Sequence, residues 1–207
     1  YLPPGTIHVA VVDAGVGTQR RLLVAQAADH YFLGPDNGLF SWIFADHPPT
    51  QLVSLENPRY WLPPLSATFH GRDILAPVAG HLSLGVPLTA LGPTQEEWLQ
   101  LPRPQPQWEA DSVRGEIIYI DHFGNLVTNL KAAALEAWRQ GRPVQVELGP
   151  HRLPQFSRTY GEVPIGEPLC LIGSHGYLEI AVNQGQAARQ LQAGKSDPIT
   201  IRVVGQP

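Results

Sequence analysis

Three prolines within seven residues divide this chain into two parts. The segment Leu101-Pro-Arg-Pro-Gln-Pro-Gln107 cannot continue a helix or a central strand, because proline lacks the backbone N–H and fixes one torsion angle. Such a segment is typical of a semi-rigid spacer. We therefore predict an N-terminal domain over 1–100, a proline-rich linker over 101–112 and a C-terminal domain over 113–207. A chain of 207 residues suffices for two modest domains or one large one.

The N-terminal part alternates strand-like and helix-like segments, which predicts an α/β layer. The run 6–12 is apolar and β-branched, so we expect a buried strand that ends at Asp13. A helix is expected over 73–84 with Pro77 near its start, and helical apolar spacing also occupies 39–44. Further strands are expected over 21–26, 31–33 and 51–55.

The C-terminal part is a succession of short strands punctuated by glycine and proline, which predicts a small all-β barrel or a sandwich. One helix is expected, over 131–139. Cys170 lies in a strand-like apolar run, so we expect an inert, buried thiol. Strands are expected over 115–121, 143–148, 167–172, 177–182 and 198–204.

Charge and hydropathy exclude several classes of function. The 14 Lys and Arg against 18 Asp and Glu give a formal net charge of −4, so no basic footprint for nucleic acid or an anionic membrane is present. The apolar runs are far shorter than the ~20 residues of a membrane span, and no signal peptide opens the sequence. A single cysteine cannot form an internal disulfide, so we expect a cytoplasmic protein.

The segment Val12-Asp-Ala-Gly-Val-Gly-Thr-Gln-Arg-Arg21 carries the first candidate chemistry. A carboxylate at the end of a buried strand faces the crevice where α/β sheets bind ligands, and Gly15 and Gly17 let the backbone approach a ligand closely. Arg20 returns at the start of the next strand, so it can meet Asp13 across a hairpin-like turn. The plainer interpretation is a turn capped by Asp13, with Arg20 as its ion pair.

Two further segments also have both chemical and structural interpretations. Pro35-Asp-Asn-Gly-Leu39 by itself is a turn and helix cap. Thr68-Phe-His-Gly-Arg-Asp-Ile-Leu-Ala-Pro77 places His70 just before a helix, where the helix dipole favours neutral imidazole, and a neutral histidine accepts a proton near pH 7. The structural alternative is a buried, hydrogen-bonded histidine, with Arg72 and Asp73 as a local ion pair and cap.

A bipartite motif lies in the C-terminal part, over Ile120–Asn129 and Gly173–Asn183, with polar groups at turns between strands. An aromatic ring beside an asparagine suits adenine, because the ring stacks and the amide pairs with a ring nitrogen and the exocyclic amine. A carboxylate and a hydroxyl suit an amino-acid head group. Taken alone, each half is an ordinary β-turn.

The remaining histidines show no metal-ligand spacing with one another, and no cysteine accompanies them. We therefore predict no metal site and no cofactor. These histidines are His8, His30, His47, His81 and His151.

Together, these four segments in this order resemble the S-adenosylmethionine hydroxide adenosyltransferase family, the adenosine-forming S-adenosylmethionine hydrolases, which are relatives of the fluorinase and chlorinase. The resemblance covers nearly the whole chain. Thr-Phe-His-Gly-Arg-Asp and the paired Phe-Gly-Asn and Leu-Glu-Ile-Ala-Val-Asn segments are its most specific parts. It implies an α/β N-terminal domain, a C-terminal β-barrel domain, and a homotrimer whose sites combine one subunit's N-terminal domain with a neighbour's C-terminal domain.

The resemblance also implies residue roles. It makes Asp13, Arg20 and His70 the catalytic group that positions and activates water. Gly71 stands where the fluorinating relative carries a serine that donates to fluoride, and with His70 it indicates the hydrolase branch. The implied substrate-binding residues are Tyr1 and Phe69 at the ribose and sulfonium, Asp121 and Ser174 at the methionine amine and carboxylate, and Phe123, Asn125 and the backbone of Val182 to Gln184 at adenine.

The chain departs from the family pattern at two places. The family reads Asp-Pro-Gly where this chain has Asp13-Ala14-Gly15, and we expect a small effect because the carboxylate is kept. The family also has a preceding segment, with a strand and an aspartate that grips the ribose hydroxyls. Because the sequence begins at Tyr1 and contains no methionine, we expect either that it is part of a longer polypeptide or that it lacks part of its site.

The predicted reaction is hydrolysis of S-adenosyl-L-methionine at the ribose 5′-carbon, which gives adenosine and L-methionine. Three alternatives stay open. A non-catalytic S-adenosylmethionine or adenosine sensor predicts binding without turnover, and a chloride-using halogenase predicts chloro-deoxyadenosine. A methyltransferase is a third, because Val12-Asp-Ala-Gly-Val-Gly resembles that fold's glycine-rich loop, but no further glycine follows at Thr18-Gln19.

Overall fold

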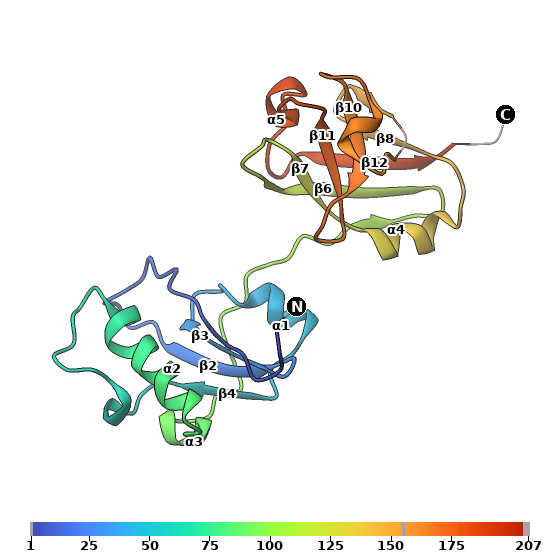
Figure 1. Cartoon of the computed structure of the whole chain (residues 1–207). Coiled ribbons are helices and arrows are strands. Elements are labelled where there is room, and N and C mark those ends of the chain that lie inside the picture. Colours follow the sequence, from blue (N-terminus) through green and yellow to red (C-terminus); the bar gives the residue numbers. More distant parts are fainter. Residues whose placement is uncertain (1, 155, 205–207) are drawn as a thin grey trace. The chain divides into compact units, whose positions relative to one another are not determined.

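The computed structural model describes residues 2–154 and 156–204 (Figure 1). The chain forms two compact units, Tyr1–Arg103 and Pro104–Pro207. Within the described residues, no helix is both long and apolar enough to cross a membrane.

The N-terminal unit is built on a four-stranded sheet with strand order β1-β3-β2-β4. β1 pairs with β3 in parallel, and the other pairs are antiparallel. Side chains of β2 alternate between two apolar clusters, with Val24 packed in the cluster that contains α2 residues and Ala25 in the cluster that contains Phe44 of α1. The elements are β1 (Ile7–Val9), β2 (Leu22–Ala27), β3 (His30–Pro35), α1 (Ser41–Asp46), β4 (Gln51–Ser54), a 3-10 turn (Pro58–Tyr60), a π-helical turn (Gly71–Leu75), α2 (Ala76–Ser83) and α3 (Leu88–Leu91).

The predicted buried strand over 6–12 is wrong in extent and in burial. Only Ile7–Val9 is a strand, and Val11 and Val12 are 53% and 66% exposed. β1 lies at the edge of the described sheet, so one side of it has no strand neighbour there. An apolar run with β-branched residues predicts strand conformation, but burial depends on neighbours that the run does not encode.

The C-terminal unit is a nearly closed, antiparallel barrel-like sheet, which confirms the predicted fold class. Its strand order is β10-β11-β7-β6-β12-β8-β9, and β5 pairs with β6 at the side. Its core includes Ile117, Leu126 and Ile180, all fully buried. The elements are β5 (Gln107–Trp108), β6 (Ser112–Ile120), β7 (Leu126–Lys131), α4 (Ala132–Arg139), β8 (Val144–Leu148), β9 (His151–Leu153), a 3-10 turn (Tyr160–Glu162), β10 (Pro168–Ile172), β11 (Tyr177–Val182), α5 (Ala187–Gln190) and β12 (Pro198–Val203).

β7 is a central strand that the sequence pattern did not predict. Two of its polar residues, Thr128 and Asn129, are buried, and both bond to backbone. Thr128 Oγ1 donates to the Leu178 carbonyl at 2.9 Å, and Asn129 Oδ1 accepts from the Glu116 N–H at 2.9 Å. Buried polar groups are tolerated when they are hydrogen-bonded in this way. Because they interrupt the run of apolar residues, the sequence pattern of a core strand is absent here.

Candidate active site

Asp13, Arg20 and His70 meet in the N-terminal unit. The Arg20 guanidinium grips the Asp13 carboxylate with two parallel bonds, from Nε to Oδ1 at 2.6 Å and from Nη2 to Oδ2. The same Nη2 lies 3.1 Å from Nδ1 of His70. The side chains of Arg20 and Asp13 are only 10% and 8% exposed, so this is a largely desolvated ion pair with good fork geometry.

The contact between Arg20 and His70 fixes which nitrogen of a neutral imidazole carries the proton. A guanidinium only donates, so Nδ1 must accept, and the neutral ring then carries its proton on Nε2. Arg20 Nη1 forms no hydrogen bond with any described residue. The N–H groups of Nη1 are therefore available to a further acceptor beside Asp13, Arg20 and His70.

The loop that carries Asp13 is fitted against the segment before His70. Turn bonds from Val16 N–H to the Asp13 carbonyl and from Thr18 N–H to the Gly15 carbonyl fold the loop, each at 3.2 Å. Gly17 has φ of 79°, and a Cβ there would meet the Ala67 carbonyl oxygen at 2.7 Å. A glycine is required because only it combines that torsion with so close an approach, and the approach brings the two motifs together.

His70 sits at the entrance of a helix that begins earlier than predicted. A π-helical turn over Gly71–Leu75 precedes α2, and π-turns occur frequently at functional sites. Asp73 is buried and accepts from the Ser66 N–H at 2.7 Å and from Arg72 Nε at 2.6 Å. The Arg72 guanidinium, with the Ser66 bond, holds the pKa of the Asp73 carboxyl below its usual range. The predicted local ion pair of Arg72 and Asp73 is therefore present, and it anchors the turn beside His70.

Phe69 and Gly71 flank His70 on a partly open surface. Phe69 is 50% exposed, and the Arg72 guanidinium lies 4.7 Å from the centre of its ring, which orients the ring by a cation–π contact. A Cβ at Gly71 would approach Cγ1 of Val11 at 2.5 Å, so a serine there requires Val11 to move. Tyr1, the other residue implied at the ribose, lies outside the described residues.

Asn37 is a residue that the sequence interpretation left as a simple turn. Its Nδ2 donates to the Val12 carbonyl at 2.9 Å, and its Oδ1 accepts from the Leu39 N–H at 3.2 Å. It therefore ties the residue before Asp13 to the start of the α1 region. The chain separation of 25 residues hides this contact, although an Asn-Gly pair between two chemical motifs is a usable signal.

In the C-terminal unit, Asp121 and Asn125 form one hydrogen-bonded turn. Asp121 Oδ1 accepts from the N–H groups of Phe123 at 2.8 Å and Asn125 at 2.9 Å, and Oδ2 accepts from Asn125 Nδ2 at 3.0 Å. Asn125 is 7% exposed and retains its amide oxygen, while Phe123 is 71% exposed. The Asp121 carboxylate thus orients the amide and leaves the aromatic ring open.

The same turn packs against the segment that follows β11. The Ala188 N–H donates to the Gly124 carbonyl at 2.9 Å, and a Cβ at Gly124 would lie 3.0 Å from Cβ of Gln186. Val182 ends β11 just before this segment, and Gln184 has φ of 53° within it. The turn that carries Phe123 and Asn125 therefore lies against residues 186 and 188, which follow the Val182–Gln184 stretch implied at adenine.

Ser174 lies at the other end of the strands from Asp121. Its turn leads into β11, and the Gly176 carbonyl accepts from the Ala132 N–H, just beyond the last residue of β7. The Asp121 turn instead enters the first residue of β7, which pairs with Ile180. The length of β7 separates the two turns, so the structure does not place Asp121 and Ser174 in direct contact.

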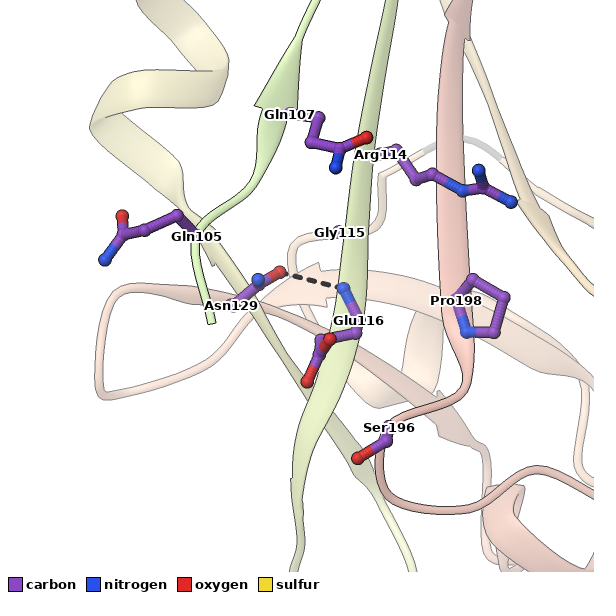
Figure 2. A pocket seen from close by; sticks show the side chains of 8 residues that line it. All are labelled: Gln105, Gln107, Arg114, Gly115, Glu116, Asn129, Ser196 and Pro198. Carbon is purple, nitrogen blue, oxygen red and sulfur yellow. Dashed lines mark hydrogen bonds between the residues drawn. The ribbon is translucent and has the colours of Figure 1, made fainter. Parts of the chain in front are cut away.

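A separate cavity of about 250 Å³ opens on the face of β6 and β12 (Figure 2). None of the catalytic or substrate-binding residues implied by the family resemblance lines it, although Asn129, the last residue of the Ile120–Asn129 motif, does. Its lining is polar and consists of Gln105, Gln107, Arg114, Gly115, Glu116, Asn129, Ser196 and Pro198. Among the described residues, no group of three or more His, Cys, Asp or Glu is arranged to hold a metal ion.

Comparisons with known proteins agree on one family. Sequence models of the SAM hydroxide adenosyltransferase N-terminal and C-terminal domains match residues 1–92 and 115–200. A Thermus thermophilus protein named (R)-S-adenosyl-L-methionine hydrolase is 41% identical over 97% of this chain and 77% of its own length. A fluorinase from an Actinoplanes species is 27% identical over 97% of this chain and 78% of its own.

A solved structure shows the same fold. The crystal structure of an uncharacterized conserved protein from Thermotoga maritima superposes with a TM-score of 0.88 and 35% identity. The match covers 97% of this chain and 78% of that one.

Proposed function

The chain belongs to the SAM hydroxide adenosyltransferase family, and from this premise we propose that it hydrolyses S-adenosyl-L-methionine to adenosine and L-methionine. The observation that carries the proposal is the direct contact of Arg20 with both Asp13 and His70. A cation, a carboxylate and an imidazole around one point are the groups needed to hold and deprotonate a water molecule.

The reaction requires a nucleophile rather than an acid. The water oxygen bonds to the ribose 5′-carbon, the carbon–sulfur bond breaks with its electron pair on sulfur, and one water proton is released. The sulfonium leaves as a neutral thioether, so no group needs to protonate it. Bulk water has a pKa near 15.7, so the site must orient the water and assist its deprotonation.

We assign these tasks to the three residues in contact. His70 and Asp13 orient the water and take its proton, and Arg20 stabilises the developing hydroxide. Two features support this assignment. The N–H groups of Arg20 Nη1 have no partner among the described residues and can donate to the developing hydroxide. The lone pair of His70 Nδ1 faces Arg20 Nη2, and a water molecule that takes the place of this donor can give its proton to Nδ1. Placing the water in line with the carbon–sulfur bond supplies part of the ~7–11 kcal/mol available from proximity.

The remaining assignments follow the family roles. Phe69 and Gly71 adjoin the ribose and sulfonium, Phe123 and Asn125 hold adenine with the backbone of Val182–Gln184, and Asp121 and Ser174 serve the methionine portion. The packing of the 121–125 turn on the 186–188 segment supports the adenine assignment. We also propose a homotrimer in which these groups come from different subunits, with no added cofactor. The cytoplasmic location stays a prediction.

The test is chromatography of S-adenosyl-L-methionine after incubation with the protein, with and without chloride. Equal amounts of adenosine and methionine in chloride-free buffer support the hydrolase. Unchanged substrate that co-elutes with the protein contradicts it and supports a sensor, and chloro-deoxyadenosine formed only with chloride supports a halogenase. Sedimentation of the same sample tests the trimer.

A further inference from the structure

The backbone of Arg20 lies just outside the sheet of the N-terminal unit. The next residue is anchored, because the Asp36 N–H donates to the Arg21 carbonyl at 2.9 Å and β2 begins one residue later. In the described part of the chain, no backbone carbonyl accepts from the Arg20 N–H. The strand ladder therefore does not set the backbone of Arg20, although its guanidinium must meet Asp13 and His70 together.

The hydroxyl of Thr18 supplies the missing contact. Thr18 Oγ1 donates to the Gly15 carbonyl at 2.7 Å and accepts from the Arg20 N–H at 3.3 Å. A hydroxyl can do both at once, because it has one donor and two acceptor lone pairs. The Thr18 N–H also donates to the Gly15 carbonyl, at 3.2 Å, which fixes Thr18 itself. One side chain thus joins the two halves of the loop that separates Asp13 from Arg20.

The same loop packs around the aliphatic stem of Arg20. A Cβ at Gly15 would lie 3.5 Å from Cγ of Arg20 and 3.6 Å from Oγ1 of Thr18, which are ordinary packing distances. The side chain of Arg20 is only 10% exposed, whereas Thr18 is exposed. Thr18 therefore adds little to the apolar core, and its hydroxyl acts on the loop.

The contact with His70 depends most on where the Arg20 backbone lies. Arg20 grips Asp13 with two bonds, and Asp13 belongs to the same loop, so this pair can move as a unit. His70 is 50 residues further along the chain and is reached by Nη2 alone, at 3.1 Å. A displacement of about 1 Å in a catalytic group can cost about 100-fold in rate. The bond to His70 is the one that a loosened loop would lose first.

We propose that Thr18 is a positioning residue for the hydrolysis. Its hydroxyl sets the Arg20 backbone so that a guanidinium already gripped by Asp13 also reaches Nδ1 of His70. This inference rests on the proposed function, because it assigns to that reaction a residue outside the group that holds the water.

The decisive variant is Thr18→Val, which removes the hydroxyl and keeps the shape and the β-branch. We expect kcat for adenosine formation to fall about 3- to 10-fold, the factor for one hydrogen bond between neutral groups, while KM stays within about twofold. Thr18→Ser keeps the hydroxyl and should restore kcat to within about twofold of the wild-type value.

Thr6→Val is the matched control. Thr6 Oγ1 also donates to the carbonyl three residues earlier, that of Pro3, and at the same distance of 2.7 Å, but Thr6 lies outside the loop. The two valine variants therefore lose the same kind of local bond. Thr6→Val should leave kcat and KM within about 1.5-fold of the wild-type values.

A second readout does not depend on turnover. The Arg20 Nε–H donates to Asp13 Oδ1 at 2.6 Å inside a largely desolvated pair. It should therefore give a slowly exchanging signal in a proton–nitrogen correlation spectrum, assigned by its absence in Arg20→Lys. Thr18→Val should shift this signal and speed its exchange with solvent at least about threefold, whereas Thr6→Val should leave it unchanged.

Each outcome either supports the proposal or overturns it. An unchanged kcat or an unchanged Arg20 signal in Thr18→Val overturns it, and so does an equal fall in kcat in Thr6→Val. A Thr18→Ser variant as slow as Thr18→Val also overturns it, because the hydroxyl would then not be the cause. If the wild-type protein forms no adenosine, the proposed function fails, and the Arg20 signal still decides whether Thr18 positions the guanidinium.

Discussion

Replacing Arg20 by lysine tests the catalytic assignment most directly, because it keeps the charge and removes the fork. Arg20 forms two bonds with Asp13 and one with His70. A lysine ammonium is a compact point charge that cannot span both partners with this geometry. At least two of the three hydrogen bonds are then lost.

The size of the effect follows from those bonds. A hydrogen bond to a charged group contributes about 1.5–3 kcal/mol, so the loss of two corresponds to about 3–6 kcal/mol. If the arrangement acts in the transition state, kcat should fall about 10²- to 10⁴-fold. Initial rates of adenosine formation, followed by chromatography at saturating substrate, measure this directly.

The neighbouring Arg21 provides a matched control. It also grips a carboxylate with two bonds, to Asp36, but its other partners are Gln95 and the Glu97 carbonyl. Arg21→Lys should lower the free energy of unfolding by at most about 1 kcal/mol and leave kcat within about threefold. Similar losses of kcat in both variants, or a normal kcat in Arg20→Lys, would refute the reasoning.

Four further predictions use other parts of the structure. His70→Ala should lower kcat by at least about 100-fold while calorimetry gives a near-normal Kd for substrate, and an equal loss of affinity argues against a role in turnover. Asn37→Ala removes the bond to the Val12 carbonyl, so kcat should fall about 10-fold, whereas unchanged initial rates mean that the loop holds Asp13 unaided. Cys170 is fully buried, and burial raises the pKa of its thiol to about 12, so a thiol reagent should label it only as the protein unfolds in denaturant. Arg72 lowers the folded-state pKa of Asp73, so the contribution of this carboxylate to stability is present above about pH 4 and is lost as the pH falls further. Urea titrations should therefore show Asp73→Asn less stable than wild type at pH 7, with a difference that shrinks as the pH falls below about 4.

Much of the fold could be predicted from local patterns in the sequence. The strand β11 was predicted with its observed bounds, and Cys170 was correctly placed in a buried strand. The helix around Pro77 was predicted to start at 73, whereas a π-helical turn begins at Gly71. Apolar alternation and capping residues act over a few positions, so they are readable without knowledge of the partner segments.

Local sequence also predicted one part of the active-site group, the pairing of Asp13 with Arg20. Asp13 and Arg20 are seven residues apart, and a short glycine-containing turn brings them into contact. His70 is 50 residues from Arg20, and no spacing rule predicts that the two side chains meet, so only the family resemblance placed them together. Physically, their approach depends on Gly17 packing against the Ala67 carbonyl, a contact between distant segments.

The sequence by itself therefore determined the chemical inventory, the two-part organisation and most strands, because residue type and short-range periodicity carry that information. Only the tertiary structure decided which side chains are buried and which side chains contact one another. It left Val11 and Val12 exposed beyond an edge strand and buried Thr128 and Asn129 in a core strand. Burial and contact are properties of chain segments that pack from afar, and no local pattern records the neighbour that a side chain will have.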